Sequence, residues 1–204
     1  MNRTFLLRSS IAMLALAGLL STAALAQQPA APAQKTAPAQ KPAAPAPAQK
    51  KAAGPTEQAV LLGQFGDWGA YTATPGGKKV CFALAKPTTA ATEPAGRPRD
   101  PSYAFVSTRP AEKVKNEVSV IVGYPQKAGI DASAAIGTTT YVMYTQNDGA
   151  WVKNAADEAK MVSAMRNGGD LVVKSESGKN TKSTDTYSLK GIAQALDKVA
   201  EECK

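Results

Sequence analysis

The sequence predicts a β-rich (α+β) fold, an antiparallel sandwich or partly open barrel with two helices, the last one C-terminal. Three observations lead to this prediction. Short runs rich in β-branched and aromatic residues recur from residue 65 onward, turn sequences separate several of them, and two later stretches repeat apolar residues at helical spacing.

The expected strands are short, and several are joined by recognisable turns. They span residues 65–73, 78–85, 103–109, 117–124, 139–145, 150–152, 170–176 and 182–188. Thr-Pro-Gly-Gly, Asn-Asp-Gly and Ser-Gly-Lys-Asn, at residues 74–77, 147–149 and 177–180, predict three hairpins. Residues 87–101, PTTAATEPAGRPRDP, are expected to be a long connection without secondary structure.

Two stretches have the period of an amphipathic helix. In the first, Asn154 is the expected N-cap and Gly168 the end, with Glu158, Met161, Val162 and Met165 on one face. In the second, Ser188 is the expected cap. Its apolar side chains recur at helical spacing and include a cysteine: Ile192, Ala195, Leu196, Val199 and Cys203.

The N-terminal residues have the three parts of a secretory signal peptide. Arg3 and Arg8 precede the apolar run IAMLALAGLL, and Ala24-Leu25-Ala26 matches a cleavage site, so we expect a signal peptide at residues 1–26. The run is shorter than the roughly 20 residues that span a bilayer, which favours cleavage after Ala26 over an uncleaved anchor. No transmembrane segment is expected after cleavage. The mature chain is expected in the periplasm, at the outer surface, or secreted.

Residues 27–55 predict a disordered linker ahead of a single globular domain at 56–204. This segment holds half of the 14 prolines and no acidic residue. It is either a spacer, whose lysines touch anionic cell-wall polymer or lipid head groups, or an inert solvated tether. These lysines are Lys35, Lys41, Lys50 and Lys51.

The charge distribution argues against a nucleic-acid partner. The formal net charge is +8, but six of the basic residues lie in the signal peptide and linker. Residues 56–204 hold 18 basic and 16 acidic residues, and the two signs are interspersed. No basic stripe of the kind that follows a phosphate backbone is present.

The two cysteines, Cys81 and Cys203, are expected to form a disulfide. An exported protein folds where thiols oxidise, and an even count favours pairing. Free buried thiols and pairing between chains are the alternatives. The bridge would pin the last helix to the second expected strand.

No familiar catalytic device is visible. The chain has no histidine, which removes Ser-His-Asp and Cys-His arrangements and imidazole metal sites. Ser177 with Lys179 and Ser188 with Lys190 are better explained by capping and solvation than as nucleophiles. Asp67, Asp100, Asp148 and Asp185 are expected in turns or beside glycine. A carboxylate pair for glycoside cleavage stays open, because such pairs need no local motif. We expect no enzyme activity, no cofactor and no metal.

Two features favour binding. The first is a tyrosine-rich set of aromatic residues, of which Trp68 and Trp151 are candidate partner contacts. The second is the connection 87–101, where Arg97 and Arg99 are expected to be exposed and able to pair with carboxylates or phosphates of a partner. Replacing both arginines is expected to leave folding intact.

Several ordered blocks carry a resemblance to a known family. FGDWGAYTATPGGKKVCFALAKP, VSVIVGYPQKAG, DGAWVKNAADEAKMVSAMRNGGDLVVKS and TDTYSLKGIAQALDKVAEEC resemble the successive blocks of the invasion-associated locus B family, small exported proteins of alphaproteobacteria. The resemblance covers about residues 64–203. Many members have a further cysteine pair, which is missing here. The resemblance implies an envelope or surface role and no known reaction.

The expected function is therefore non-catalytic binding in the envelope, with a role in host-cell invasion or adhesion implied only by the resemblance. The partner, a protein or an envelope polymer, is not identified. A hydrolase of a wall polymer is the alternative, and an inhibitor or scaffold of wall enzymes is a third possibility.

Overall fold

The structure, a computed structural model, describes residues 59–204. The predicted signal peptide (1–26) and linker (27–55) lie outside the described residues. Within them, eleven strands and two α-helices follow one another as β1 (Val60–Phe65), β2 (Trp68–Ala73), β3 (Val80–Ala85), β4 (Thr89–Glu93), β5 (Tyr103–Arg109), β6 (Val114–Ile121), β7 (Ala132–Ile136), β8 (Thr139–Gln146), β9 (Gly149–Val152), α1 (Ala155–Asn167), β10 (Asp170–Glu176), β11 (Lys182–Ser188) and α2 (Ile192–Glu202). The predicted β-rich fold with a C-terminal last helix is confirmed.

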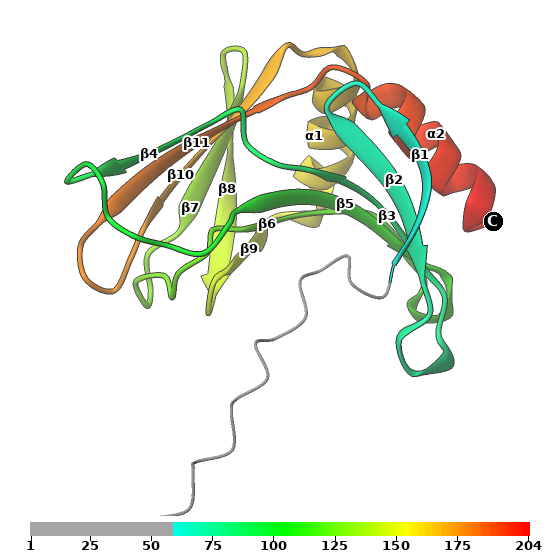
Figure 1. The fold of residues 1–204 in the computed structure, drawn as a ribbon, viewed down its shortest axis with the longest axis horizontal. Coiled ribbons are helices and arrows are strands. Elements are labelled where there is room, and N and C mark those ends of the chain that lie inside the picture. Colours follow the sequence, from blue (N-terminus) through cyan, green and yellow to red (C-terminus); the bar gives the residue numbers. More distant parts are fainter. Residues whose placement is uncertain (1–58) are drawn as a thin grey trace, which may run out of the picture. The chain divides into compact units, whose positions relative to one another are not determined.

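The strands form one antiparallel sheet in the order β1-β2-β3-β5-β6-β9-β8-β7-β10-β11-β4. The three predicted hairpins are present, because β2 pairs with β3, β8 with β9, and β10 with β11. Figure 1 shows the sheet bending from β4 and β11, through β9 and β6, to β1 and β2. The sheet stays open, since β1 and β4 are its two edges.

The two ends of the sheet approach each other where β11 leads into α2. Trp68 donates from its indole Nε1 to the carbonyl oxygen of Ser188 at 2.8 Å. The backbone N–H of Asp67 donates to the carbonyl oxygen of Lys190 at 3.0 Å. Gly191 makes this approach possible: its φ is +94°, and a Cβ there would lie 1.8 Å from the carbonyl oxygen of Phe65.

The apolar core lies between one face of the sheet and the two helices. α2 packs on β1, β2, β3 and β5, and α1 packs on β6, β7 and β9. The strands under α2 present small buried side chains such as Ala70, Ala83 and Ala104, which let the helix approach closely. Neither helix of the described part is long and apolar enough to cross a membrane.

The first helix begins as predicted, and the second does not. Asn154 Oδ1 accepts the backbone N–H of Ala156 at 3.0 Å, so the predicted cap of α1 is confirmed. α2 begins at Ile192, and Ser188 is the last residue of β11. The predicted Ser188 cap is wrong because strand pairing with Asp170 holds that residue extended.

The sequence analysis did not predict three of the strands, β1, β4 and β7. The segment 87–101, predicted to lack secondary structure, contains β4, which pairs with β11. The predicted strand 65–73 is divided by a turn at Gly66 and Asp67 between β1 and β2. Only Thr92 of β4 is even partly buried, so that strand shows no apolar alternation that could have revealed it.

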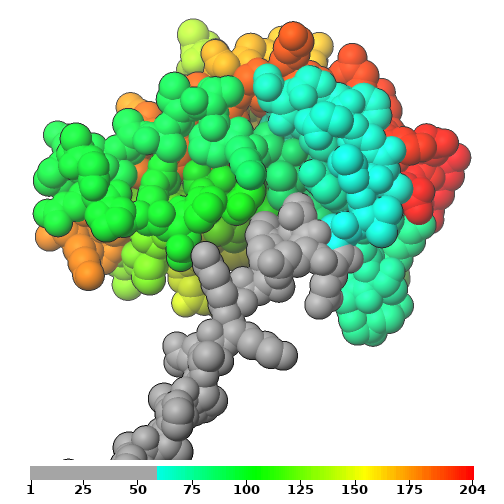
Figure 2. Space-filling view, viewed as in Figure 1, coloured from blue at the N-terminus to red at the C-terminus, as the bar shows by residue number. Residues whose placement is uncertain are grey.

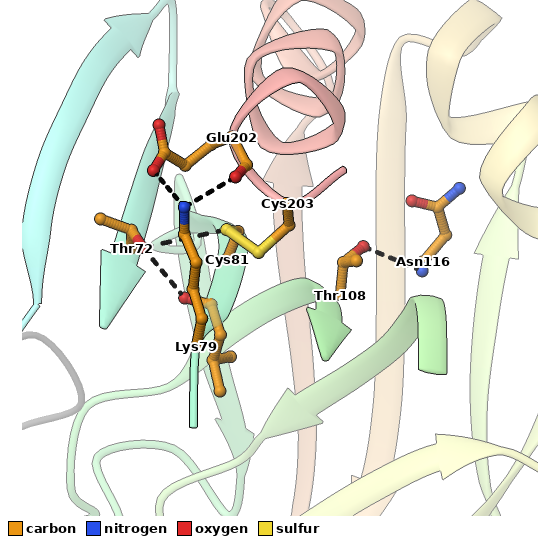
Figure 3. Close-up of a disulfide and its surroundings, with 8 residues drawn as sticks. Thr72, Lys79, Cys81, Thr108, Asn116, Glu202 and Cys203 are labelled. Atoms are coloured by element: carbon orange, nitrogen blue, oxygen red, sulfur yellow. Dashed lines mark hydrogen bonds and ion pairs between the residues drawn. A yellow bond between two sulfur atoms is a disulfide. The ribbon is translucent and has the colours of Figure 1, made fainter. Parts of the chain in front are cut away.

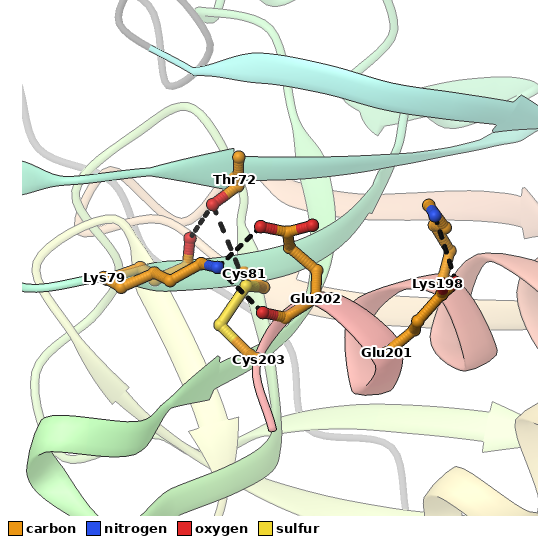
Figure 4. A network of polar contacts seen from close by, with 8 residues as sticks. Thr72, Lys79, Cys81, Lys198, Glu201, Glu202 and Cys203 are labelled. Atoms are coloured by element: carbon orange, nitrogen blue, oxygen red, sulfur yellow. Dashed lines mark hydrogen bonds and ion pairs between the residues drawn. A yellow bond between two sulfur atoms is a disulfide. The ribbon is translucent and has the colours of Figure 1, made fainter.

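The predicted disulfide is present and ties the end of α2 to β3. Cys81 and Cys203 are 122 positions apart in sequence, with their Cα atoms 5.9 Å apart (Figure 3). Lys79 Nζ adds a polar contact beside the bridge, donating to the Glu202 carbonyl oxygen at 2.8 Å and to its carboxylate at 2.6 Å (Figure 4). The same few residues therefore attach the helix end covalently and by charge.

Candidate functional site

The inward face of β10 and β11 becomes polar toward the β10–β11 turn, unlike the apolar face beneath the helices. Its buried polar side chains are Ser175, Ser183, Asp185 and Tyr187. The sequence KSTDTYS produces this arrangement, because alternate residues of a strand point to the same face. Each of the four bonds to a residue of the segment 99–102 or 124–126, and we call these four pairs the polar seam.

The central pair of the polar seam is a buried ion pair between Arg99 and Asp185. The guanidinium contacts the carboxylate at two points: Nη1 donates to Oδ2 at 2.8 Å, and Nη2 donates to Oδ1. Nη1 also donates to the carbonyl oxygen of Val122 at 3.1 Å. The side chains are 10% and 1% exposed. Donating these hydrogen bonds to Asp185 raises the pKa of Arg99, so its guanidinium stays charged.

This placement corrects two expectations. Arg99 is not an exposed side chain, and its donors are already used within the protein. Replacing it would leave Asp185 buried without a counter-charge, so for Arg99 we now expect the change to destabilise the fold, contrary to the expectation from the sequence. Asp185, which the sequence analysis grouped with the turn aspartates, lies inside β11, within the strand predicted at 182–188.

The remaining pairs of the polar seam are neutral. Tyr124 and Ser183 share a hydroxyl–hydroxyl bond of 2.6 Å, and Ser175 donates to Gln126 Oε1 at 2.7 Å. Tyr187 donates to Ser102 Oγ at 3.3 Å, and burial raises the pKa of Tyr187 above its usual value. Throughout residues 59–204, every buried side-chain nitrogen and oxygen has a partner. The seam is thus a satisfied structural network.

A pocket of about 550 Å³ opens beside the seam. It lies between the loop after β4 and the β10–β11 turn, which are neighbours at the left of Figure 2. Its lining residues are Thr92, Arg97, Pro98, Arg99, Tyr124, Pro125, Ser177, Gly178, Lys179 and Thr181. Small-molecule sites are usually concave pockets of about 300–1,000 Å³, a range that includes this one.

Two exposed cations line this pocket, Arg97 from the loop after β4 and Lys179 from the β10–β11 turn. Within residues 59–204 neither side chain has an ion-pair partner. Each segment is held by a hydrogen bond from a backbone N–H to a side-chain hydroxyl. Thr92 Oγ1 accepts the N–H of Arg97 at 3.2 Å, and Ser177 Oγ accepts the N–H of Lys179 at 3.2 Å. The two free charges therefore lie on ordered turns.

The tryptophans predicted as partner contacts lie elsewhere. Trp68 is fully buried beneath α2, which leaves its ring no surface to offer a partner. Trp151 is partly exposed and stacks on Tyr144, with ring centroids 5.6 Å apart, on the sheet face that the helices leave free. The structure therefore brings together Arg97 and Arg99 but neither of the tryptophans.

Lys179 and Tyr124 line the pocket, but the sequence analysis did not predict them as partner contacts. The polar alternation of KSTDTYS was the available signal, since a strand with Ser183, Asp185 and Tyr187 on one face must find polar partners for it. In the Ser177–Lys179 and Ser188–Lys190 pairs the serine hydroxyl accepts the backbone N–H of the lysine, a local turn hydrogen bond that does not cap a helix. The described residues contain no group of three His, Cys, Asp or Glu side chains placed to hold a metal.

The comparisons with known proteins identify a family. A family model described as "Invasion associated locus B (IalB) protein" matches residues 68–200, which include both helices' buried faces and the Arg97–Lys179 pocket. No curated protein and no solved structure matches the chain.

Proposed function

Because the chain belongs to the invasion associated locus B (IalB) family, we propose that it is an exported envelope protein whose domain binds an anionic group of a partner and performs no reaction. The partner is another envelope component or, as the family's name suggests, a component of a host-cell surface. The Cys81–Cys203 disulfide supports export, because such bridges persist in oxidising compartments.

The observation that carries the proposal is the pair of free cations in one pocket. Arg97 offers a planar fork of donors that matches a carboxylate or a phosphate, and Lys179 offers a point charge in the same pocket. The lining contains no carboxylate, and Asp185 behind it is neutralised by Arg99. An anion entering the pocket would meet positive charge without repulsion.

The same lining supports binding over hydrolysis of a wall polymer. Cleaving a glycosidic bond ordinarily requires two carboxyl groups, roughly 5–10 Å apart, on either side of the bond. None of the residues that line this pocket carries a carboxylate, and Asp185, which contacts the lining residue Arg99, accepts bonds from that arginine through both of its oxygens. Asp185 is thus held in a buried ion pair, 1% exposed, which does not favour a role as an acid or a nucleophile.

The test uses soluble muropeptides, wall fragments whose peptide stems end in carboxylates, with binding measured by calorimetry. Arg97→Ala and Lys179→Ala are each expected to weaken binding by about tenfold or more, the usual scale for a lost hydrogen bond to a charged group. Raising the salt concentration should weaken binding by the wild-type protein, because the two cations are exposed.

Lys174→Ala is the matched control, since Lys174 is an exposed lysine on β10 outside the Arg97–Lys179 pocket. Its binding should equal that of the wild type. If the Arg97 and Lys179 variants bind muropeptides as tightly as this control, the pocket is not the anion site.

A further inference from the structure

The sheet face opposite the helices carries a continuous row of aromatic side chains. Tyr71 and Phe82 pair directly across β2 and β3, and their rings stack with centroids 5.4 Å apart. Phe105 on β5 lies 5.9 Å from Phe82, and Tyr103 lies 6.2 Å from Phe105. We call Tyr71, Phe82, Phe105 and Tyr103 the aromatic ladder.

The aromatic ladder is separate from the core beneath the helices. Phe82 and Leu84 are only 7% and 6% exposed, yet neither belongs to the apolar cluster that the helices cover. The adjacent residues Cys81, Ala83 and Ala85 do belong to it. Because side chains alternate along a strand, Phe82 and Leu84 must face the other way, where neighbouring rings shield them.

A hollow of about 420 Å³ lies at the β2 end of the aromatic ladder. The Tyr71 ring and Leu84 provide its apolar surface, and Gln64, Asp67 and Lys86 provide polar groups around it. Gly69 sits beneath the Tyr71 ring: a Cβ at this position would lie 2.6 Å from Tyr71 Cε2. Because Gly69 has no side chain, the Tyr71 ring can pack directly on the backbone of the strand. Aromatic side chains cover strand glycines in this way.

The polar groups around this hollow are available to a ligand. Gln64 uses its amide nitrogen to donate to the Gly66 carbonyl oxygen at 3.0 Å, which leaves the amide oxygen as an acceptor. Asp67 and Lys86 take part in no ion pair within residues 59–204. Lys86 Nζ lies 6.0 Å from the centre of the Tyr103 ring. The hollow thus combines an acceptor, an anion and a cation around an aromatic surface.

This combination fits a sugar ring. A pyranose has an apolar face of C–H groups, which stacks on an aromatic ring, and a rim of hydroxyls that both donate and accept hydrogen bonds. Opposite charges on Asp67 and Lys86 favour a neutral polar ligand over a polyanion. A nucleic-acid strand would need a cationic groove along its backbone, and Lys86 is the one cation among the residues that line this hollow.

We propose that the hollow, with Tyr71 at the end of the aromatic ladder as its stacking surface, forms a saccharide-binding site for a neutral oligosaccharide. The site shares no residue with the Arg97–Lys179 pocket. The saccharide proposal is therefore independent of the anion-binding function and can be tested separately. Such a site would give the protein a second contact with a wall or surface glycan.

The experiment measures binding of a neutral tetrasaccharide of β-1,4-linked N-acetylglucosamine to the disulfide-bonded protein by calorimetry. Tyr71→Ala should weaken binding by roughly tenfold, because the stacking surface is lost, and Tyr71→Phe should bind nearly as well as the wild type. Asp67→Asn should also weaken binding, and its backbone N–H can still donate to the Lys190 carbonyl oxygen. Tyr144→Ala is the control, since Tyr144 is an exposed aromatic on the same face but outside the hollow.

Wild-type protein that binds no tetrasaccharide at millimolar concentration would overturn the proposal. So would unchanged binding by both Tyr71→Ala and Asp67→Asn, or tighter binding of a single-stranded oligonucleotide than of the sugar. If Tyr71→Ala does not fold, Asp67→Asn and Tyr71→Phe decide the question. The double variant Arg97→Ala/Lys179→Ala should keep its tetrasaccharide affinity, which separates this site from the anion pocket.

Discussion

Asp185 is a buried residue of the sheet whose replacement should cost several kcal/mol of stability. Its carboxylate is 1% exposed and accepts both of its strong bonds from Arg99. Asp185→Ala leaves the guanidinium buried without its counter-charge, so we expect a loss of roughly 3–5 kcal/mol in the free energy of unfolding. Denaturant titration monitored by circular dichroism measures this loss.

Arg97→Ala is the matched control for that prediction, because Arg97 is exposed and unpaired within residues 59–204. It should change the free energy of unfolding by less than about 0.5 kcal/mol. The double replacement Arg99→Met/Asp185→Leu should be milder than Asp185→Ala, since it removes both charges together. Equal losses for Asp185→Ala and Arg97→Ala would show that the ion pair does not hold the seam.

Glu158 is a second residue whose charge affects the stability of the fold, but here the charged form of the side chain destabilises it. Burial raises the pKa of Glu158, although the backbone N–H of Val118 donates to its Oε1 at 2.9 Å and partly offsets this. The folded protein therefore holds the proton more tightly than the unfolded chain. Stability falls as the pH rises from the unfolded-state pKa through the folded-state pKa of this residue.

Glu158→Gln should remove that pH dependence, because glutamine keeps an acceptor for Val118 and carries no charge. Above the folded-state pKa we expect the variant to be more stable, by about 1 kcal/mol or less, since Glu158 is only half-buried. Thermal unfolding across the acidic to neutral range measures both effects. A wild type and a variant with parallel stability curves would show that burial does not perturb this carboxyl.

At the scale of elements, α2 is attached in two independent ways. Its apolar face, formed by Ile192, Leu196 and Val199, is buried on β1, β2 and β3. The disulfide then fixes the last turn to β3. Each buried side chain contributes about 1.5–3 kcal/mol before chain entropy is subtracted. The helix should therefore stay docked when the bridge is absent.

Reduction, or Cys203→Ser, should lower the melting temperature and leave the secondary structure unchanged. The chain-entropy relation for a loop closed by residues 122 positions apart gives about 5 kcal/mol as the upper value. Cys81→Ser combined with Cys203→Ser should cost little more than either change alone, because each removes the same bridge. Thermal unfolding by circular dichroism compares the three variants.

Thiol titration of the unfolded, unreduced protein gives the direct check on the disulfide. No titratable thiol is expected, and two per chain would contradict the bridge. Lys79→Gln is a useful reference variant, because it removes the exposed contact to Glu202 and keeps the disulfide. Lys79 lowers the pKa of Glu202 by its hydrogen bond, so this contact weakens as the pH falls through the pKa of Glu202.

At the scale of the whole molecule, composition predicts that the chain consists of a linker followed by a domain. Residues 27–55 hold half of the prolines and no acidic residue, and they are predicted to be open to proteases. Limited proteolysis should remove the chain up to about residue 55 and leave a fragment with the melting temperature of the full protein. Mass spectrometry identifies the fragment, and a fragment that unfolds at a clearly lower temperature would show that the linker stabilises the domain.

The sequence was most informative where local chemistry and tertiary structure agree. The hairpins β2–β3, β8–β9 and β10–β11 were predictable because turn residues at 74–77, 147–149 and 177–180 join runs of strand-forming side chains. β4 and β7, with the sequences TAATE and ASAAI, were missed because small residues carry little strand preference. Their pairing is decided by neighbouring strands.

The candidate pocket was also predictable only in part, because the pairing of distant strands brings its residues together. Arg97 could be selected because it lies in a Pro-rich connection, whereas Lys179 lies in an ordinary hairpin turn. Arg99 looked equivalent to Arg97 in the sequence. The sheet order places β11 beside β4, and this brings Asp185 to Arg99, 86 positions earlier in the chain. No local pattern contains that information.

The sequence by itself determined the β-rich class, the two helical faces and the cysteine pairing, because each depends on periodicity, composition or a count of two. The tertiary structure decided which polar residues are buried, which sheet face stays free of helices, and which cations share a pocket. These depend on strand order and on the bend of the sheet, which bring together residues far apart in the chain. Two arginines in one loop thereby acquire different roles, because only one of them reaches a buried carboxylate.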